Sequence, residues 1–188
     1  MLAWIDTETT GLDPQTCDLL EIAIVITDDD LNTLVTFNEV IHVKLARNTL
    51  DEWIVKTHGE SGLLDEVDNS KQSLAVVETE LVKGLLCEFS KEELRKTPIA
   101  GSSVHFDRAF LQVHAPALIG LFSHRTLDVS SLSEATERWS PRLQQKRKKA
   151  LSKGITAHRA MADIEYSIAS ARWFRKHLFR RGLRGLLG

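Results

Sequence analysis

Hydrophobic and polar positions divide the chain into a strand-rich beginning and a mostly helical remainder. Residues 1–8, 19–27 and roughly 33–43 are rich in Ile, Val, Leu and Thr, which is typical of β-strands. Turn signals separate them, the first at 11–14 and the second at 28–32. The pattern therefore predicts that the chain opens with three antiparallel strands.

Further along, short strands alternate with helical periodicity. In chain order we expect a helix (74–89), a strand (98–102), a helix (106–114), a strand (126–129), a helix (131–139) and a long terminal helix (157–179). Strands that alternate with helices tend to pair in parallel. The predicted fold class is thus α/β, with a mixed sheet of three antiparallel strands followed by parallel strands, flanked by helices.

Length and composition indicate an ordinary globular protein. The 188 residues suffice for one domain, which we place at 1–179, followed by a basic C-terminal tail at 180–188. No apolar run approaches the roughly 18 residues needed to cross a membrane, and the start lacks the layout of a signal peptide. The two cysteines have no metal-ligand or disulfide spacing, so a cytoplasmic location is expected.

The net charge of −2 bears on the partners of the chain. It argues against a broad cationic surface that coats long nucleic acids, and it allows short anionic substrates. The basic run Lys146–Lys149 is either a solvated loop or helix or an edge that contacts RNA.

Two acids stand one residue apart in the first strand, in the segment WIDTETTG. Positions i and i+2 of a strand share a face, so Asp6 and Glu8 lie side by side. Two carboxylates held so close resist ionising together unless a cation separates them. The pair on its own could also simply face solvent.

Later segments supply further polar groups. Asp107 begins a helix after a strand, and His158 precedes Asp163 by five residues where the last helix starts. Taken singly, the acid could favour the helix dipole and the histidine could cap the helix. Taken together with Asp6 and Glu8, they provide four carboxylates and an imidazole. Such oxygen ligands suit two divalent cations, Mg²⁺ or Mn²⁺, in a phosphodiester-cleaving site in which the imidazole is the base.

These motifs resemble those of the DEDD 3′→5′ exonucleases of the ribonuclease-H-like fold, in the subgroup whose last motif carries His. The likeness is greatest to the oligoribonuclease family, through segments that include DEWIVKTHGESGL, PIAGSS, LDVSSL and HRAMADIEYS. The resemblance implies 3′→5′ degradation of short single-stranded RNA to mononucleotides by a homodimer. It also implies that Asp6, Glu8, Asp107 and Asp163 bind the metals and that His158 is the catalytic base.

The resemblance gives substrate-binding roles to six other residues. Leu12 is similar to a wedge between bases, and Trp53 to a stacking platform, although Trp53 could instead be a core anchor. His58 and Ser103 would lie near phosphates. Arg125 and Ser130 would come from the second subunit and cap the 5′ phosphate.

Some positions depart from the family pattern. His124 stands where a Tyr is common, and Ser102 and Phe106 replace the usual Asn and Gln. These changes bear on substrate length and rate more than on the reaction. Two other functions stay open: a DNA-directed 3′→5′ exonuclease or proofreading module, and a relative that binds nucleotides without cleaving them.

Overall fold

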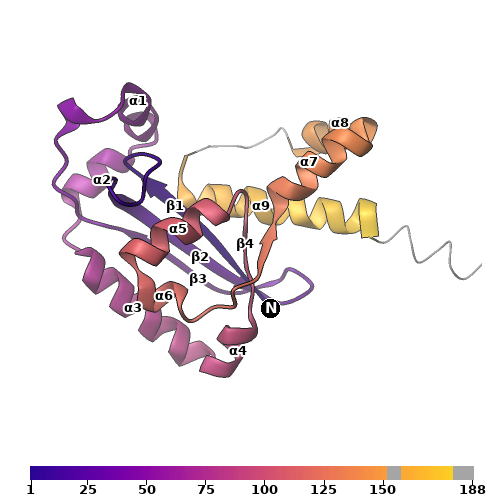
Figure 1. Cartoon of the computed structure of the whole chain (residues 1–188), viewed down its shortest axis with the longest axis horizontal. Helices are drawn as coiled ribbons and strands as arrows, with labels where there is room; N and C mark the ends of the chain where they lie inside the picture. The colour runs from indigo at the N-terminus through magenta and orange to yellow at the C-terminus, as the bar shows by residue number, and fades with distance from the viewer. Residues whose placement is uncertain (152–157, 180–188) are drawn as a thin grey trace, which may run out of the picture.

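A five-stranded sheet forms the centre of the computed structural model, which describes residues 1–151 and 158–179 (Figure 1). The strands lie in the order β3-β2-β1-β4-β5. Their bounds are β1 Leu2–Thr9, β2 Leu19–Thr27, β3 Thr33–Val40, β4 Ile99–Gly101 and β5 Thr126–Asp128. β1, β2 and β3 pair antiparallel, whereas β4 pairs parallel with both β1 and β5. The predicted fold class is confirmed.

Helices cover both faces of the sheet, because the central strands are apolar on both sides. On one face Ile5 packs with α3 (Leu74–Glu88), α5 (His105–His114) and α6 (Pro116–Ile119). On the other face Trp4 packs with α7 (Val129–Trp139) and α9 (Ala160–Phe174). Alternate residues of β1 therefore serve two separate cores, as the period of a strand requires.

The remaining helices lie around the sheet. They are α1 (Glu52–Glu60), α2 (Leu63–Asn69), α4 (Lys91–Lys96), α8 (Pro141–Leu151), the short 3₁₀ turn Arg47–Thr49 and a π-helical turn, Arg175–Phe179. Gly62 links α1 to α2 with a φ of 78°, a value that favours glycine. Helices α1 and α8 stand at opposite ends of the molecule (Figure 1). Among the described residues, no helix is both long and apolar enough to cross a membrane.

The bounds of two elements differ from those that the sequence predicts. The third strand stops at Val40 rather than near residue 43. The last helix begins at Ala160 and gives way after Phe174 to the π-helical turn, so it is shorter than predicted at both ends. Residue 157, the predicted start of this helix, and the predicted tail at 180–188 lie outside the described residues.

The basic run at the end of α8 is helical and only partly solvated. Arg147 is buried: its guanidinium donates to Gln144 Oε1 and Ser170 Oγ and lies over the ring of Phe174. Lys148 pairs with Glu137 of α7. This arginine therefore packs α8 against α9, and a uniformly solvated run was the wrong interpretation for this position.

Candidate active site

Three carboxylates meet where β1 ends and α9 begins. Asp6 and Glu8 project from one face of β1, and Asp163 lies in the first turn of α9. Each offers one oxygen, and these oxygens all lie within 4.8 Å of one another. Because every donor is a carboxylate oxygen, the group has the chemistry of a site for a hard divalent cation.

Asp107 approaches this group from α5 but stands slightly apart. Its Oδ1 accepts hydrogen bonds from the Thr7 backbone N–H at 2.8 Å and from the Thr7 hydroxyl at 2.7 Å. Thr7 lies between Asp6 and Glu8 and points to the opposite face of β1, towards α5. Threonine at this position thereby fixes the fourth carboxylate next to the strand that carries the first two.

Burial and mutual repulsion raise the pKa values of these acids. Burial is the main cause for Asp6, whose pKa lies well above its usual range, and the charge of Asp107 adds to it. Burial also raises the pKa of Glu8 to about 8, with Asp163 as the next contributor. The pKa of Asp107 rises to about 6, again through burial, although the Thr7 hydrogen bonds oppose the shift. A bound cation would remove the repulsion that these shifts express.

His158 stands at the exposed rim of the carboxylate group. Its backbone N–H donates to Asp163 Oδ2 at 3.1 Å, and its φ of 70° is in the left-handed region, which is rare for a residue other than glycine. Its ring meets the ring of Trp53 edge to face, with centroids 5.5 Å apart. The imidazole therefore lies beside Trp53, and the backbone of His158 is bound to Asp163.

A hollow of about 580 Å³ opens beside the carboxylates. Leu12 and Trp53 stand at its mouth and are 82% and 56% exposed, so neither is a core anchor. Asp51 caps α1 by accepting the Trp53 backbone N–H at 2.8 Å, which fixes the start of that helix. Phe106 also lines the hollow, at a position where the family commonly has a polar residue. Apolar side chains thus line much of this hollow, and the carboxylate of Glu8 lies in its wall.

His58 forms part of the floor of this hollow. It is 1% exposed, and its Nε2 lies 3.2 Å from the Thr9 carbonyl oxygen and 3.8 Å from Glu8 Oε2. Its Nδ1 has no hydrogen-bond partner among the described residues. Burial lowers the pKa of this imidazole. A buried nitrogen without a partner is costly, so it is suited to bind a polar group of a ligand.

Ser103 and Ser130 lie together in an adjoining hollow of about 550 Å³. The Ser103 hydroxyl donates to Ser130 Oγ at 3.2 Å, and Asp128 accepts the backbone N–H groups of both serines. Arg125 and His124 are exposed just before β5. Within one chain, therefore, the two serines are neighbours, while Arg125 does not line either hollow.

Two charged residues near the carboxylates escaped the sequence analysis. Glu21 is 0% exposed on β2, directly opposite Glu8 in the sheet register, and it pairs with Arg159. A signal for Glu21 was present, because a lone acid in the apolar run LLEIAIVIT must find a partner. The partner itself is 138 positions away, and no local pattern indicates such a pairing.

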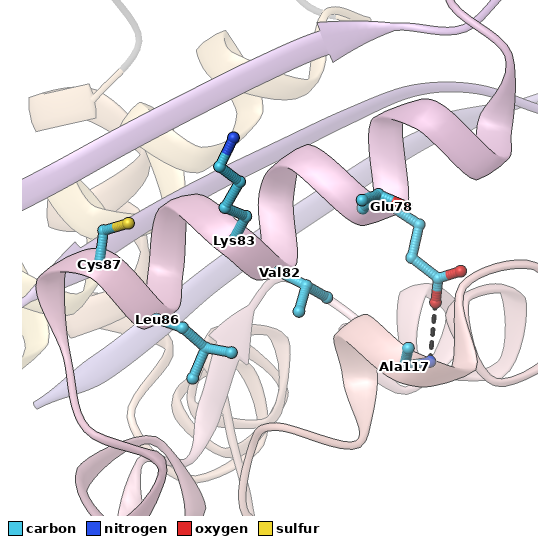
Figure 2. A pocket seen from close by; sticks show the side chains of 7 residues that line it. Glu78, Val82, Lys83, Leu86, Cys87 and Ala117 are labelled. Atoms are coloured by element: carbon cyan, nitrogen blue, oxygen red, sulfur yellow. Dashed lines mark hydrogen bonds between the residues drawn. The ribbon is translucent and has the colours of Figure 1, made fainter.

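Another hollow lies between α3 and α6, on the outer side of the helices (Figure 2). Val82, Leu86 and Cys87 line it along α3, and Glu78 accepts the Ala117 backbone N–H at 2.7 Å. The acid is therefore engaged in capping α6. This hollow brings together no group of metal ligands and is separate from the carboxylates.

Comparison with known proteins defines the class to which this fold and site belong. A family model described as "Exonuclease" matches residues 3–170. The chain therefore belongs to the exonuclease family.

Curated relatives within this family are oligoribonucleases. The one from Pseudomonas syringae pv. syringae is 44% identical over 184 residues, which is 95% of this chain and 96% of the relative. The one from Pseudomonas aeruginosa strain PAO1 is 41% identical over 182 residues, again 95% and 96% of the two chains. The oligoribonuclease of Neisseria meningitidis is 39% identical and covers 94% of this chain and 91% of its own. The family resemblance seen in the sequence is confirmed: this is an oligoribonuclease-family chain.

Solved structures of exonuclease I share the fold. One, titled as suggesting how processivity is achieved, has a TM-score of 0.69 at 21% identity and covers 95% of this chain. The zinc-bound E. coli ExoI–ssDNA complex has a TM-score of 0.67 at 19% identity. This chain spans only 41% of either of those chains, so the likeness concerns one part of exonuclease I.

Proposed function

We propose that the protein is a 3′→5′ exoribonuclease that degrades short single-stranded RNA oligonucleotides to 5′-mononucleotides by metal-dependent hydrolysis. The observation that carries this proposal is the convergence of Asp6, Glu8 and Asp163 within 4.8 Å, beside an apolar hollow, in a chain 44% identical to an oligoribonuclease. Carboxylates of this kind suit phosphodiester chemistry, and the apolar hollow suits a nucleobase.

Four acids would hold two divalent cations, Mg²⁺ or Mn²⁺: Asp6, Glu8, Asp107 and Asp163. The fit rests on the all-oxygen donor set and on the raised pKa values, which come from burial first and from the neighbouring carboxylates second. Such cations supply charge stabilisation at the phosphate and leaving oxygens. Thr7 keeps Asp107 in place, and its two hydrogen bonds favour the ionised carboxylate that a cation needs.

His158 would be the general base. Water forms a new bond to phosphorus and gives a proton to the imidazole, while the bond between phosphorus and the 3′ oxygen breaks. The freed 3′ oxygen takes a proton from solvent, and the products are a 5′-mononucleotide and a shortened RNA. Imidazole is the side chain that most often takes a proton in general base catalysis.

Leu12 and Trp53 would contact the terminal bases, because both are exposed at the mouth of the hollow. Stacking tolerates any base and therefore suits an enzyme that accepts every sequence. His58 would lie beside a phosphate at the floor of the hollow, and the exposed Ser103 would contact a neighbouring phosphate. Phe106 adds apolar surface rather than the amide of the family pattern.

A second copy of the chain would complete the site. In this proposal Arg125 and Ser130 of one subunit cap the 5′ phosphate of RNA bound to the other, which limits the substrate to short chains. His124, where Tyr is common, would leave this cap shorter. The cytoplasmic location and the assignment of 1–179 as a single domain also stay predictions.

The DNA-directed alternative has no observation of its own in support, since likenesses of 19–21% identity to exonuclease I concern the fold alone. The test uses 5′-labelled RNA and DNA of two to about twenty-four nucleotides, each with and without Mg²⁺. We expect Mg²⁺-dependent shortening from the 3′ end, fastest for RNA dinucleotides. Faster cleavage of DNA than of matched RNA, or of long RNA than of dinucleotides, would contradict the proposal.

A further inference from the structure

Arg159, the residue after His158, binds two carboxylates at once. Its Nε and Nη2 donate to the two oxygens of Glu21, each at 3.1 Å. Its Nη1 and Nη2 donate to the two oxygens of Glu66 at 2.8 and 2.7 Å. The planar guanidinium therefore makes a forked contact on each side, a geometry that only arginine provides.

The two carboxylates belong to different parts of the fold. Glu21 is fully buried on β2, opposite Glu8, whereas Glu66 lies half-exposed on α2. Glu21 also accepts the backbone N–H of Ala160, the first residue of α9, at 3.1 Å. Arg159 and Glu21 thus attach the start of α9 to the sheet, and Glu66 attaches it to α2.

His158 is held between these attachments and the carboxylate group. The next residue, Arg159, is fixed by four hydrogen bonds. The backbone N–H of His158 itself donates to Asp163. Its left-handed backbone conformation, with φ of 70°, persists only where the surroundings impose it. The direction of the imidazole, against Trp53, therefore depends on where Arg159 is anchored.

We propose that Glu21, Arg159 and Glu66 form a clamp whose role is to position His158 for proton transfer. None of the three contacts the reacting atoms, so they are positioning residues. This inference rests on the proposed function, in which His158 is the base. It predicts that loosening the clamp slows the chemical step with little effect on the binding of substrate or metal, because three of the four carboxylates lie on β1 and α5 and the fourth keeps its place within α9.

Arg47 offers a matched control. Its Nη2 also bridges two acids of α2, Asp65 at 3.0 Å and Asp68 at 2.5 Å, but Arg47 precedes α1 and is no neighbour of His158 in the chain. If bridging arginines only stabilise α2, then Arg47→Lys and Arg159→Lys should act alike. Lysine keeps the charge beside buried Glu21 but provides no fork, so Arg159→Lys is preferable to a truncation that leaves that acid unpaired.

The experiment compares wild type, Arg159→Lys, Glu66→Gln and Arg47→Lys in dinucleotide kinetics, Mn²⁺ titration and ¹H–¹³C NMR of the histidine rings. His158→Ala identifies the His158 signal, because that signal alone should be missing from its spectrum; Trp53→Ala would shift the signals of both histidines whose rings meet the indole. For Arg159→Lys we expect kcat to fall about 10- to 100-fold, as a misplaced catalytic group implies. KM and Mn²⁺ affinity should stay within about twofold, and the His158 signal should move. Glu66→Gln should give the same effects in smaller measure, and Arg47→Lys none of them.

Two results would overturn the clamp. One is an unchanged kcat and an unchanged His158 signal in Arg159→Lys. The other is an equal loss of activity in Arg159→Lys and Arg47→Lys that follows their unfolding temperatures. Absence of cleavage by the wild type would refute the proposed function instead, and the NMR signal of His158 would then still decide whether Arg159 sets its position.

Discussion

The imidazole of His158 and the indole of Trp53 meet edge to face, with ring centroids 5.5 Å apart. His158 lies two residues before α9, and Trp53 lies in the first turn of α1, 105 positions earlier in the chain. The proposed base and the proposed stacking platform are therefore direct neighbours. A nucleobase that stacks on Trp53 would lie next to the group that accepts the proton from water.

Trp53→Ala should weaken the binding of RNA dinucleotides. Stacking of a base on an aromatic ring contributes about 1–3 kcal/mol, which corresponds to a rise in KM of roughly 5- to 150-fold. Steady-state kinetics with a dinucleotide measure this, and the Mg²⁺ concentration for half-maximal rate should not change. Val55→Ala, on the exposed side of the same helix, is the control. An unchanged KM in the Trp53 variant would remove the stacking assignment.

His158→Ala should lower kcat by about 10²- to 10⁴-fold, the usual contribution of a general base. Mn²⁺ affinity should persist, because the ligands Asp6, Glu8 and Asp163 do not include this side chain. Single-turnover cleavage and a Mn²⁺ titration separate the two effects. A wild-type rate in this variant would show that another group takes the proton.

Asp163→Asn should abolish Mg²⁺-dependent cleavage and, above about pH 8, where Glu8 is ionised, raise the unfolding temperature of the metal-free protein. The substitution removes one of three carboxylates that repel one another within 4.8 Å, while the amide oxygen can still accept the His158 N–H. Thermal unfolding in a chelator measures the stability. Glu165→Gln, on the exposed face of the same helix, should change neither property. An unchanged or lowered unfolding temperature of Asp163→Asn at this pH would contradict repulsion among the three carboxylates.

Stability without metal should fall as the pH rises. The folded pKa of Glu8 is about 8 against an ordinary value of 4.5, so the folded state binds the extra proton between these limits. The free energy of unfolding therefore decreases with pH across this window. Mn²⁺ should reverse the trend and release protons as it binds. Unfolding curves between pH 5 and about 8, with and without Mn²⁺, test this, and Glu8→Gln should flatten the metal-free dependence.

Much of the fold follows from local sequence. The strands β1 and β2 are runs of β-branched and aliphatic residues, and α3 has regular apolar spacing, so each could be predicted from its own segment. The helix α1 was missed because EWIVKTHGE has a glycine near its end and little apolar face, and it packs through Ile54 and His58. The burial of Arg147 was also missed, since its partners lie on α9.

Those parts of the site could be predicted in which the spacing of residues along the chain fixes their relative positions. Asp6 and Glu8 share a face because they are two positions apart in a strand, and this followed from the sequence alone. The pairing of Glu21 with Arg159, and of Thr7 with Asp107, joins residues about a hundred or more positions apart. Only the folded chain shows these contacts, because they depend on how β2, α5 and α9 are placed around β1.

The most direct test of the account is a crystal of the protein grown with Mn²⁺ and a 5′-mononucleotide, measured at the manganese absorption edge. We expect anomalous peaks among the carboxylates of Asp6, Glu8, Asp107 and Asp163, with the nucleotide phosphate against the metal and the base beside Trp53. Anomalous peaks elsewhere, or an empty carboxylate group with the nucleotide bound, would contradict it.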